Sequence, residues 1–591
     1  MGAIAIFLAG AGKPAPDVVE AMAAAAPHRG SRVDTLVLGR CALSCSNPAD
    51  LSDAIIGYSD GMAAAFVGVL DNAQQLARDL KARGASVPAT NPALLLAAGF
   101  RVFGENLPAR LRGVFAGAVT DGERVHCFRD QVGYGPLFYR IDGRGFFAAS
   151  EAKQVVAGAA IPKEPDLDVV GEIFFRHVID DTLCALRGVR RLPKSICMTV
   201  DRDGVRLRRY WVPEDLLETA QFSSEDVQAR FDQLMDQAVS RCLTGHDVLS
   251  LSGGIDSSAL AAFAAPRHLE LAGHPLHAMS VVYPRYPSVD ERRYVELLAD
   301  HFRMPLHTFE QKANAVADLA QWVALTDTPY QSAALAQYAE DYRHARGLGF
   351  RTILTGEHAE FVSAMQWFLL DHYFTHGRIR AARRELAERR AKGRSWVSLG
   401  RLVARSLAPG AVIAARDRLR RRRPPDVPDW VDWRKATAAT SMPVRDRWRK
   451  IQLAGTAGSG ASLEAEEVCQ AVCGVRTRRP WTDVDLWEFF LSLPAEQKFP
   501  DTIPKGLVRN LLRGRVPDEI LDRRDKTVFD EAALAEVDYA ALRGLLLHSD
   551  HRIDGVDYEL LGRRLGAEDF GIVDYMWATA LAAVHAFLSQ W

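Results

Sequence analysis

The segment "LSLSGGIDSSALAA" contains residues whose types and spacing suit phosphate binding. An apolar run typical of a strand leads into two adjacent glycines, and a helical pattern follows them. Glycine lets the backbone approach a ligand closely, and N–H groups at the start of a helix attract anions. No lysine precedes the hydroxyl residues, so the segment is not a Walker A loop. The residues expected to bind phosphate are Ser252, Gly253, Gly254, Ser257 and Ser258.

Asp256 lies within the same turn, where its carboxylate would repel a phosphate group unless a cation lay between them. Mg2+ suits this position because it binds one or two carboxylates together with nucleotide phosphates. The segment therefore predicts a site for a magnesium-bound nucleotide, with Asp256 as a metal ligand.

The segments around this turn indicate an α/β domain. From about Ser223, long helical patterns alternate with the short apolar runs "HDVLSL", "LHAMSVVY" and "FRTILTG". Strands that alternate with helices predict a parallel, doubly wound sheet, in which ligands bind beyond the carboxyl ends of the strands. The segments "SGGIDSS", "SVVYP" and "TGEHAE" all follow such strands. We therefore expect them to contribute to one site.

Residues 1 to about 210 have a different pattern. Short β-rich runs such as "AAAFVGVL", "GVFAGAVT", "RVHCF" and "GFFAAS" alternate with turn residues, and helical stretches occupy Pro16–Ala26 and Ala73–Lys81. This pattern predicts a layered α+β domain with antiparallel sheets. We place the domains at residues 1–212 and 213–591.

Composition limits the classes of protein that the chain can belong to. Its 591 residues are enough for two or more domains. Hydrophobic residues make up 48% and charged residues 25%, and the net charge is −1, so nothing indicates nucleic acid or a membrane as a partner. The apolar run Ala3–Ala9 lacks a basic region before it and is too short for a bilayer, and no other run approaches about 20 residues. We expect a cytoplasmic protein.

The eight cysteines are dispersed along the chain, which predicts reduced thiols rather than a disulfide framework. Cys41 and Cys45 are four residues apart, as are Cys469 and Cys473. Neither pair has the CxxC spacing or nearby histidines of a zinc site. We interpret both pairs as buried structural thiols.

A basic insertion occupies about residues 376–425 of the second domain. Its sequence from Arg378 to Arg423 contains few acidic residues and predicts one or two basic helices, followed by the proline-rich "PPDVPDW". Two interpretations remain open. The helices present either a solvated face or a docking surface for an acidic peptide or a partner protein.

The complete SGGxDS motif between a strand and a helix resembles the pyrophosphate-binding signature of the ATP pyrophosphatase superfamily, whose members split ATP into AMP and pyrophosphate. Downstream, "TGEHAEF", "GVRTRRPWTDVDLWEF" and "KGLVRNLLRGRVPDEILDRRDKTVF" resemble asparagine synthetases. Upstream, "HRG", "FVGVLDN", "LRGVFAGAVTD", "FRDQVGYGPLFYR" and "FFAASEAK" resemble the class II glutamine amidotransferase domain of asparagine synthetase B. The resemblance implies an Ntn-hydrolase-like sandwich followed by an α/β ATP pyrophosphatase domain of the adenine nucleotide alpha hydrolase-like fold.

The resemblance also implies roles for individual residues. Lys526 matches a catalytic lysine that stabilises charge on the α-phosphate and the acyl oxygen. Glu357 matches a glutamate near the attacking amine, so it is a candidate base or a structural hydrogen-bonding group. Glu360 stands where the family has a second metal-binding aspartate, and its alternative role is a solvent-facing loop residue. Asp290 and Glu291 match a family position, but we interpret them as capping the next helix. Further nucleotide contacts are implied for Ser280, Val281, Gly356, Lys505 and Arg509.

The first domain departs from the amidotransferase pattern at its reactive positions. A class II amidotransferase uses an N-terminal cysteine, exposed by removal of Met1, as its nucleophile, but residue 2 is Gly. The family's glutamine-holding stretch "NGEIYN" is "VGVLDN" here, with Val67 and Val69 in place of Asn and Glu. We therefore predict that the chain does not hydrolyse glutamine.

An adenylating domain beside a degraded glutaminase predicts that the nucleophile is an amine of the substrate itself. Two branches of the family have such substrates: β-lactam-type synthetases and lasso peptide cyclases, which this chain resembles most. The expected function is ATP- and Mg2+-dependent cyclisation of a precursor peptide through an Asp or Glu side chain and the N-terminal amine. A leader peptidase and a leader-recognition protein are the implied partners. The alternatives are an ammonia-dependent asparagine synthetase, a β-lactam-type synthetase, or a non-catalytic peptide-binding scaffold.

Overall fold

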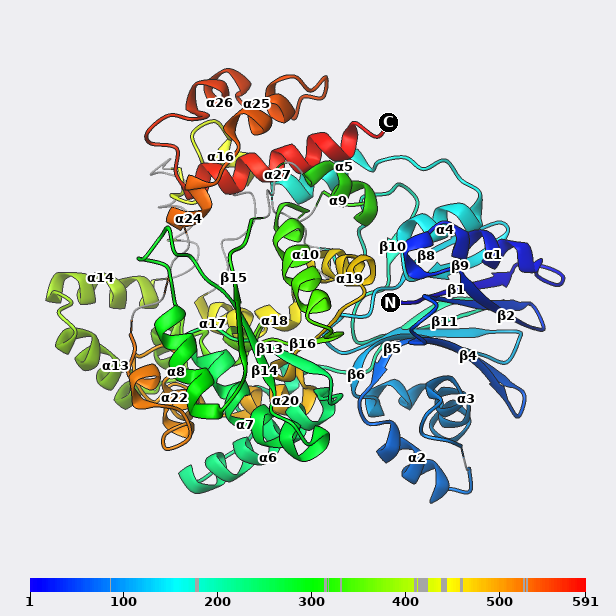
Figure 1. Ribbon diagram of the computed structural model, residues 1–591, viewed down its shortest axis with the longest axis horizontal. Helices are drawn as coiled ribbons and strands as arrows, with labels where there is room; N and C mark the ends of the chain where they lie inside the picture. The colour runs from blue at the N-terminus through cyan, green and yellow to red at the C-terminus, as the bar shows by residue number, and fades with distance from the viewer. Residues whose placement is uncertain are drawn as a thin grey trace.

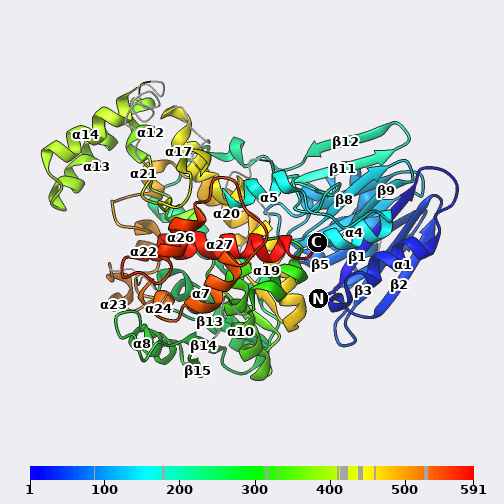
Figure 2. The same cartoon turned by 90° about the horizontal axis from the view of Figure 1, so that it is seen from above.

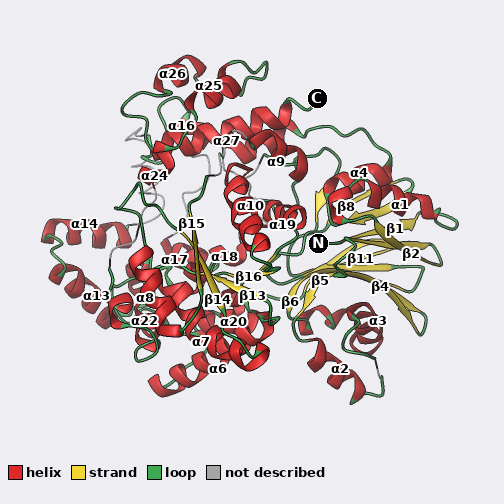
Figure 3. Cartoon of the chain, viewed as in Figure 1, coloured by secondary structure: helices red, strands yellow, loops and turns green. Residues whose placement is uncertain are grey.

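Two antiparallel sheets and one parallel sheet form the framework of the computed structural model, which spans residues 1–591 (Figures 1 and 3). The antiparallel sheets belong to the first part of the chain and the parallel sheet to the second, so both predicted sheet types are confirmed. The structure describes all residues except 86, 176–179, 313–315, 317, 330–331, 409–411, 413–422, 437–443, 458–460, 525–526 and 528–529.

The first part of the chain folds as a sandwich of two sheets. Their strand orders are β10-β8-β9-β1-β3-β2 and β12-β11-β7-β6-β5-β4, and the paired neighbours are antiparallel. The predicted β-rich runs correspond to β5, β6, β7 and β9. The strands are β1 (Ala3–Ala9), β2 (Arg32–Leu38), β3 (Cys41–Asn47), β4 (Ala54–Ser59), β5 (Met62–Leu70), β6 (Gly113–Thr120), β7 (Val125–Arg129), β8 (Phe138–Asp142), β9 (Gly145–Ala149), β10 (Arg190–Arg191), β11 (Ile196–Asp201) and β12 (Gly204–Arg209).

Helices cover the outer faces of this sandwich. Strand β1 is buried on both sides because Ile4 and Ile6 face the second sheet, whereas Ala5 and Phe7 face the covering helices. The predicted helices at Pro16 and Ala73 are confirmed, but α3 was not predicted, because its sequence "PALLLAAGFRVF" is too uniformly apolar to show a polar face. The covering helices are α1 (Pro16–Ala24) and α4 (Ala152–Ala159) on the first sheet, and α3 (Pro92–Phe103), with α2 (Ala73–Lys81) beside it, on the second.

The second part of the chain contains the parallel sheet, in the order β15-β14-β13-β16-β17. The predicted apolar runs form β13, β14 and β16, whereas β15 and β17 were not predicted as strands. The sequence of β17, "RTR", lacks the apolar residues of a buried strand. The strands are β13 (Asp247–Ser250), β14 (His277–Val281), β15 (Leu306–Phe309), β16 (Thr352–Leu354) and β17 (Arg476–Arg478).

Helices pack on both faces of the parallel sheet, as in a doubly wound domain. On one face lie α6 (Ser224–Cys242), α7 (Ile255–Ala272) and α20 (Val484–Ser492), and on the other lie α10 (Ser332–Gly347) and α19 (Ala461–Cys473). Within the described residues, no helix combines the length and apolarity needed to cross a membrane. The other helices are α5 (Leu167–Phe174), α8 (Arg292–Phe302), α9 (Leu319–Thr326), α11 (Ala359–Ser363), α12 (Leu369–Thr375), α13 (Ile379–Ala391), α14 (Trp396–Leu407), α16 (Trp433–Ala436), α17 (Val444–Gln452), α18 (Ala454–Ala457), α21 (Ala495–Lys498), α22 (Gly506–Leu511), α23 (Asp518–Leu521), α24 (Asp530–Ala535), α25 (Tyr539–Leu547), α26 (Tyr558–Arg564) and α27 (Ile572–Leu588).

The basic insertion forms two helices, α13 and α14, which extend from the edge of the molecule in both views (Figures 1 and 2). The prediction of basic helices is confirmed for this part of the insertion. Its continuation at residues 409–411 and 413–422 lies outside the described residues.

All eight cysteines are free thiols, as predicted. Cys41 and Cys45 are buried on β3, and burial raises the pKa of Cys41 to about 12 and that of Cys45 to about 11. Cys469 and Cys473 lie one turn apart on α19. These thiols are therefore packing residues of the core.

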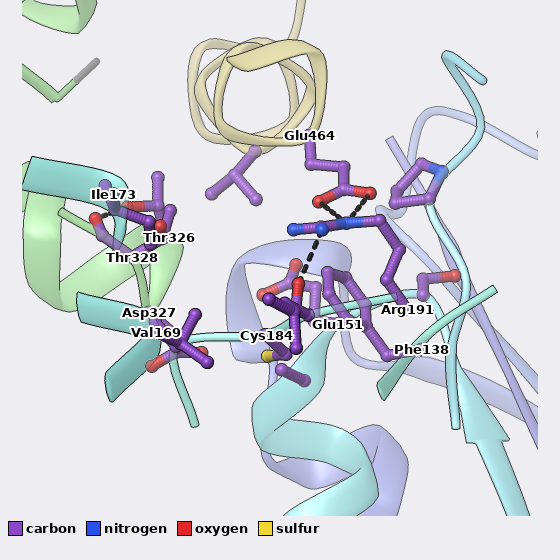
Figure 4. Close-up of a pocket in the computed structure, with 16 residues that line it drawn as sticks. Phe138, Glu151, Val169, Ile173, Cys184, Arg191, Thr326, Asp327, Thr328 and Glu464 are labelled. Carbon is purple, nitrogen blue, oxygen red and sulfur yellow. Dashed lines mark hydrogen bonds and ion pairs between the residues drawn. The ribbon is translucent and has the colours of Figure 1, made fainter. Parts of the chain in front are cut away.

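A buried cluster of charges joins the sandwich to α19 of the second part (Figure 4). The Nε atom of Arg191 lies 2.7 and 2.8 Å from the two carboxylate oxygens of Glu464, and Nη1 of Arg129 lies 3.2 Å from the nearer one. All three side chains are buried, which is favourable only while each charge has its partner. Glu464 therefore fixes how the two parts of the chain meet.

Replacement of this carboxylate by an amide tests the interface. Glu464→Gln leaves two buried guanidinium groups without a counter-charge, so we expect a destabilisation of about 3 kcal/mol, seen as a lower midpoint of thermal unfolding. Glu559→Gln is the matched control, because it breaks an exposed pair with Arg563 and should cost less than about 1 kcal/mol. Equal, small effects of the two variants would contradict this account of the interface.

Candidate active site

The predicted phosphate-binding turn connects β13 to the first turn of α7. The Ser257 hydroxyl donates to the Ser252 carbonyl at 2.9 Å and lies 3.2 Å from the Ser252 N–H, which donates to it. The Ser258 hydroxyl donates to the Gly254 carbonyl at 2.7 Å. Ser257 and Ser258 therefore hold the shape of the turn, whereas Ser252 is exposed. The turn presents the N-terminal end of an 18-residue helix, which attracts anions.

Gly253 occupies the most crowded position of the turn. A Cβ atom there would lie 2.7 Å from Nη1 of Arg523 and 2.8 Å from Cβ of Tyr294. The Arg523 guanidinium stacks on the Tyr294 ring, with 4.2 Å between its Cζ and the ring centroid. A side chain at residue 253 would separate this pair, so glycine is required here for packing.

Glu291 holds the turn in place, a role that the sequence did not reveal. Its carboxylate accepts hydrogen bonds from the Gly253 N–H at 3.1 Å, from Arg523 at 2.9 Å and from the Thr527 hydroxyl at 2.7 Å. Glu291 is the N-cap residue of α8, as predicted, but only its backbone carbonyl bonds that helix, because its side chain makes no capping hydrogen bond. Asp290 does accept a bond from a backbone N–H at the start of α8, at 3.1 Å.

Asp256 has one satisfied and one unsatisfied carboxylate oxygen. Oδ2 accepts a hydrogen bond from the ammonium group of Lys505. Oδ1 is buried and has no hydrogen-bond partner within the described part of the chain. A buried, unpaired carboxylate oxygen is unfavourable, and a cation would satisfy it. The site thus fits Mg2+ bound by Asp256 and nucleotide phosphates, although the described residues contain no cluster of three or more metal-ligating side chains.

Lys505 lies in a loop that the backbone geometry holds at the turn. Its φ angle of +62° is in the left-handed region, and the next residue, Gly506, begins α22. A Cβ atom at Gly506 would lie 2.4 Å from Oδ1 of Asp501. Arg509 donates to two backbone carbonyls of neighbouring loops, and burial lowers its pKa. Arg509 therefore braces this loop, and its predicted contact with phosphate stays a prediction.

The loop after β16 packs directly on the same turn. A Cβ atom at Gly356 would lie 2.9 Å from the Ser257 nitrogen and 3.0 Å from the Asp256 carbonyl carbon. These backbone atoms belong to the first turn of α7 and cannot move aside cheaply. The absence of a side chain at residue 356 therefore brings the two loops together, and it places Glu357 beside the phosphate-binding turn.

Glu357 is anchored by an arginine from the segment after β17. Its Oε2 atom lies 2.9 Å from Nε of Arg479, which also pairs with the buried Glu466. Burial raises the pKa of Glu357 in spite of Arg479, and the nearby charges of Glu466 and Glu360 raise it further. A carboxylate with a raised pKa beside the turn is a suitable proton acceptor. Glu466 was not found by sequence reasoning, because nothing in α19 marks it as facing the site.

The remaining predicted residues are distributed as follows. Ser280 and Val281 end β14, next to β13, and Ser280 is buried. Glu360 is exposed in the first turn of α11, and no described residue bonds to its side chain. Its role as a metal ligand stays a prediction. Lys526 lies outside the described residues.

Residue 2 of the sandwich has no space for a side chain. A Cβ atom at Gly2 would lie 2.4 Å from the Ser46 carbonyl oxygen and 2.7 Å from Cβ of Ala54, and the Gly2 N–H donates to Asp53 at 2.7 Å. Residue 2 therefore has no space for the side chain of a nucleophile. A cavity beside Val67 is also lined by Met1, Asp53 and Arg479.

Three arginines at β17 join this region to the candidate site. Arg476 pairs with Asp53 and Arg478 with Asp71, both on the sandwich, because residues two apart on a strand point to the same side. Arg479 follows the strand and points to Glu357. The sandwich therefore positions the strand that holds the candidate base.

Comparisons with known proteins agree with these two parts. The model of the asparagine synthase family matches residues 230–565, which is more than half of the chain. The chain belongs to the asparagine synthase family. The model of the glutamine amidotransferase domain matches residues 1–211. As a member of the asparagine synthase family, the chain is an ATP-dependent, AMP-forming carbon–nitrogen ligase with an amidotransferase-like sandwich and a synthetase domain.

The curated relatives of this chain are named as glutamine-hydrolysing enzymes, whereas residue 2 of this chain is a glycine. Asparagine synthetase [glutamine-hydrolyzing] 3 of Bacillus subtilis is 27% identical over 78% of this chain and 74% of its own length. A putative glutamine-hydrolysing asparagine synthetase of Mycobacterium bovis is 29% identical over 34% of this chain and 32% of its own length. A solved glutamine phosphoribosylpyrophosphate amidotransferase of B. subtilis covers 54% of this chain and 82% of its own, with 14% identity and a TM-score of 0.28, too low to support an argument.

Restoring the cysteine alone should not restore a glutaminase. Gly2→Cys forces side-chain atoms against the backbone of β3, so we expect a destabilisation of roughly 1–3 kcal/mol and no release of glutamate from glutamine. Mass spectrometry should establish that Met1 has been removed from the tested protein. Gly143→Cys is the control for stability, since nothing lies within 4 Å of a Cβ atom there. Glutamine hydrolysis by the stable Gly2→Cys protein would refute the prediction.

Proposed function

We propose that this asparagine synthase family member is a lasso peptide cyclase. It adenylates an Asp or Glu side chain of a precursor peptide and joins it to the peptide's N-terminal amine as an isopeptide bond, with release of AMP and pyrophosphate. The observation that carries the proposal is Gly2, which has no space for a nucleophile, beside a synthetase site that retains Asp256, Lys505 and Glu357. The attacking amine must then come from another source, and the substrate is the simplest one.

The reaction has two balanced steps. A carboxylate is a poor acyl donor in water, so its oxygen first attacks the α-phosphorus of ATP and displaces pyrophosphate. The amine then attacks the acyl carbon, loses a proton and displaces AMP. Holding both groups of one peptide in the site makes the second step intramolecular, which favours it over attack by free amines.

The side chains of the site have different proposed roles in binding and catalysis. Asp256 and the first turn of α7 would hold Mg-ATP, whose metal ion neutralises the phosphates, and Glu360 is the second proposed ligand. Lys505 can leave Asp256 for a phosphate oxygen when the nucleotide binds. Glu357 would accept the proton of the amine, since Arg479 fixes its position and burial raises its pKa. Lys526 is the proposed stabiliser of the transferred charge.

The proposal extends to ligands and partners. ATP and Mg2+ are the proposed cosubstrate and cofactor, and a precursor peptide is the substrate. A leader peptidase and a leader-recognition protein are the proposed partners, in the cytoplasm. An ammonia-dependent asparagine synthetase or a β-lactam-type synthetase is the second candidate, and a non-catalytic scaffold is the third. The names of the relatives favour asparagine synthesis among these alternatives.

The reaction itself is the first test. Incubation with Mg-ATP and the cognate linear core peptide should release AMP and pyrophosphate and lower the peptide mass by one water. Asp256→Asn should reduce product formation roughly a hundredfold, because it removes the charge that holds the metal ion, whereas the exposed Asp300→Asn should not. Chromatography of the nucleotides and mass spectrometry of the peptide measure both products. AMP formation with aspartate and ammonia, and none with the peptide, would favour asparagine synthesis, and full activity of Asp256→Asn would exclude catalysis at this site.

The pH dependence of the rate tests Glu357. The raised pKa means that Glu357 is protonated at low pH and cannot accept the proton of the amine, so kcat should rise with pH through that pKa and then level. Glu357→Gln should remove this rise and lower kcat roughly a hundredfold. Asp341 is the necessary control, because burial raises its pKa to about 7 and it lies near Glu357. Asp341→Asn should keep the rise, and loss of the rise in this variant alone would assign it to Asp341.

A further inference from the structure

The α13–α14 hairpin carries a groove that the proposed chemistry does not use. The two helices lie at the edge of the molecule (Figures 1 and 2), and the groove that their residues line has a volume of about 780 Å³. This is large enough for several side chains of a bound peptide. Its main lining residues are Arg389, Arg394, Arg401, Arg405, Leu399 and Leu402.

Arginine side chains give the groove a positive charge, which few carboxylates of the described residues balance. None of the described residues that line it is acidic. Arg389 pairs with Glu385 on its own helix, at 2.6 Å. Arg394, Arg401 and Arg405 have no carboxylate partner within the described ranges of the chain. Three guanidinium groups around one groove, without a carboxylate partner among the described residues, are suited to bind carboxylates of another molecule.

Apolar side chains lie beside these arginines. Val397, Arg401 and Arg405 are spaced by four residues and so share one row of α14. Trp396 and Leu407 lie on the neighbouring face, three helical turns apart. Trp396 is 71% exposed, Val397 63% and Leu407 61%, although such side chains are normally covered. The surface therefore combines cationic and apolar contacts.

The hairpin also touches the loop that carries Lys505. The Thr502 N–H donates to Glu388 of α13 at 2.9 Å, and Lys392, after the same helix, donates to the Thr502 hydroxyl. Lys505 follows three residues later and bonds Asp256. A molecule held in the groove thus lies on a hairpin whose helix α13 contacts the loop of Lys505.

We propose that the α13–α14 groove is the docking site for an acidic peptide segment that carries apolar residues. Its carboxylates bind Arg394, Arg401 and Arg405, and its apolar side chains cover Trp396 and Val397. The groove favours a peptide over a lipid surface, since a flat bilayer cannot enter it. It favours a peptide over nucleic acid because the exposed apolar residues offer no contact to phosphates and the chain as a whole has a net charge of −1. The identification of this segment with the precursor or its recognition partner rests on the proposed function.

A binding experiment that does not depend on catalysis tests the proposal. The probe is a fluorescein-labelled, 16-residue synthetic peptide with Glu and Leu at helical spacing, and fluorescence anisotropy measures its affinity for the full chain. Arg401→Glu with Arg405→Glu should raise Kd by about tenfold or more, since two attractions become repulsions. Affinity of the native chain should also fall with added salt. A peptide with Lys in place of Glu should not bind.

Control variants distinguish binding at this groove from effects on the catalytic site and from effects of net charge. Arg230→Glu with Arg563→Glu changes the net charge equally at exposed helices elsewhere and should leave the Kd unchanged. Asp256→Asn should bind the probe normally even where it forms no AMP, so loss of catalysis and loss of docking are distinguishable. Thermal unfolding should show that the charge-reversed hairpin still folds.

Several outcomes would overturn the proposal. These are no binding of the acidic peptide to the native chain, or binding that the Arg401/Arg405 reversal does not weaken. Tighter, reversal-sensitive binding of a 20-base-pair DNA duplex or of phosphatidylserine vesicles would assign the groove to those ligands instead. Concentration-dependent self-association that the reversal abolishes, measured by sedimentation, would assign it to a second copy of the chain.

Discussion

The phosphate-binding turn and the loop after β16 can meet only because residue 356 has no side chain. With a Cβ atom at Gly356, the loop would have to withdraw from the backbone of Asp256 and Ser257. Glu357, which follows directly, would then lose its place beside the turn and its bond to Arg479. The candidate base, the candidate metal-binding carboxylate and the anion-attracting helix therefore depend on one contact between two backbones. Such contacts are built at the carboxyl ends of adjacent parallel strands, where loops from β13 and β16 emerge together.

Buried charges extend this arrangement into the sandwich. Arg476 and Arg478 reach carboxylates of the amidotransferase-like domain, while Arg479 reaches the synthetase site from the same short segment. A buried guanidinium is tolerated only with a partner, so loss of the sandwich would leave β17 with uncompensated charges. This explains in physical terms why a chain without the amidotransferase nucleophile still contains the domain. The sandwich acts as a support for the adenylating site, and Glu464 reinforces the support at a second place.

The crowded position of Gly2 and the candidate site at the start of α7 both bear on where the attacking amine comes from. The first has no space for a nucleophile, and the second retains a buried carboxylate oxygen without a partner in the described part of the chain. These two features agree with the proposal that the enzyme activates a carboxylate and receives its amine from a source other than glutamine. The α13–α14 hairpin, which contacts the loop of Lys505, carries the groove proposed to bind an acidic peptide.

Local sequence indicated the sheet types, the candidate phosphate-binding turn and the absence of a cysteine at residue 2, because each depends on short-range pattern or on the identity of a few residues. Glycine pairs, alternating apolar runs and the missing cysteine at residue 2 can all be read without knowing what lies opposite them. Only the tertiary structure decided the role of Glu291, which the sequence assigned to a helix cap, and of Glu466 on α19. It also showed "RTR" to be a strand, because its arginines find carboxylates on a distant domain. Partners of a charged side chain come from segments hundreds of residues away, and local sequence does not encode which charges the fold will bring together.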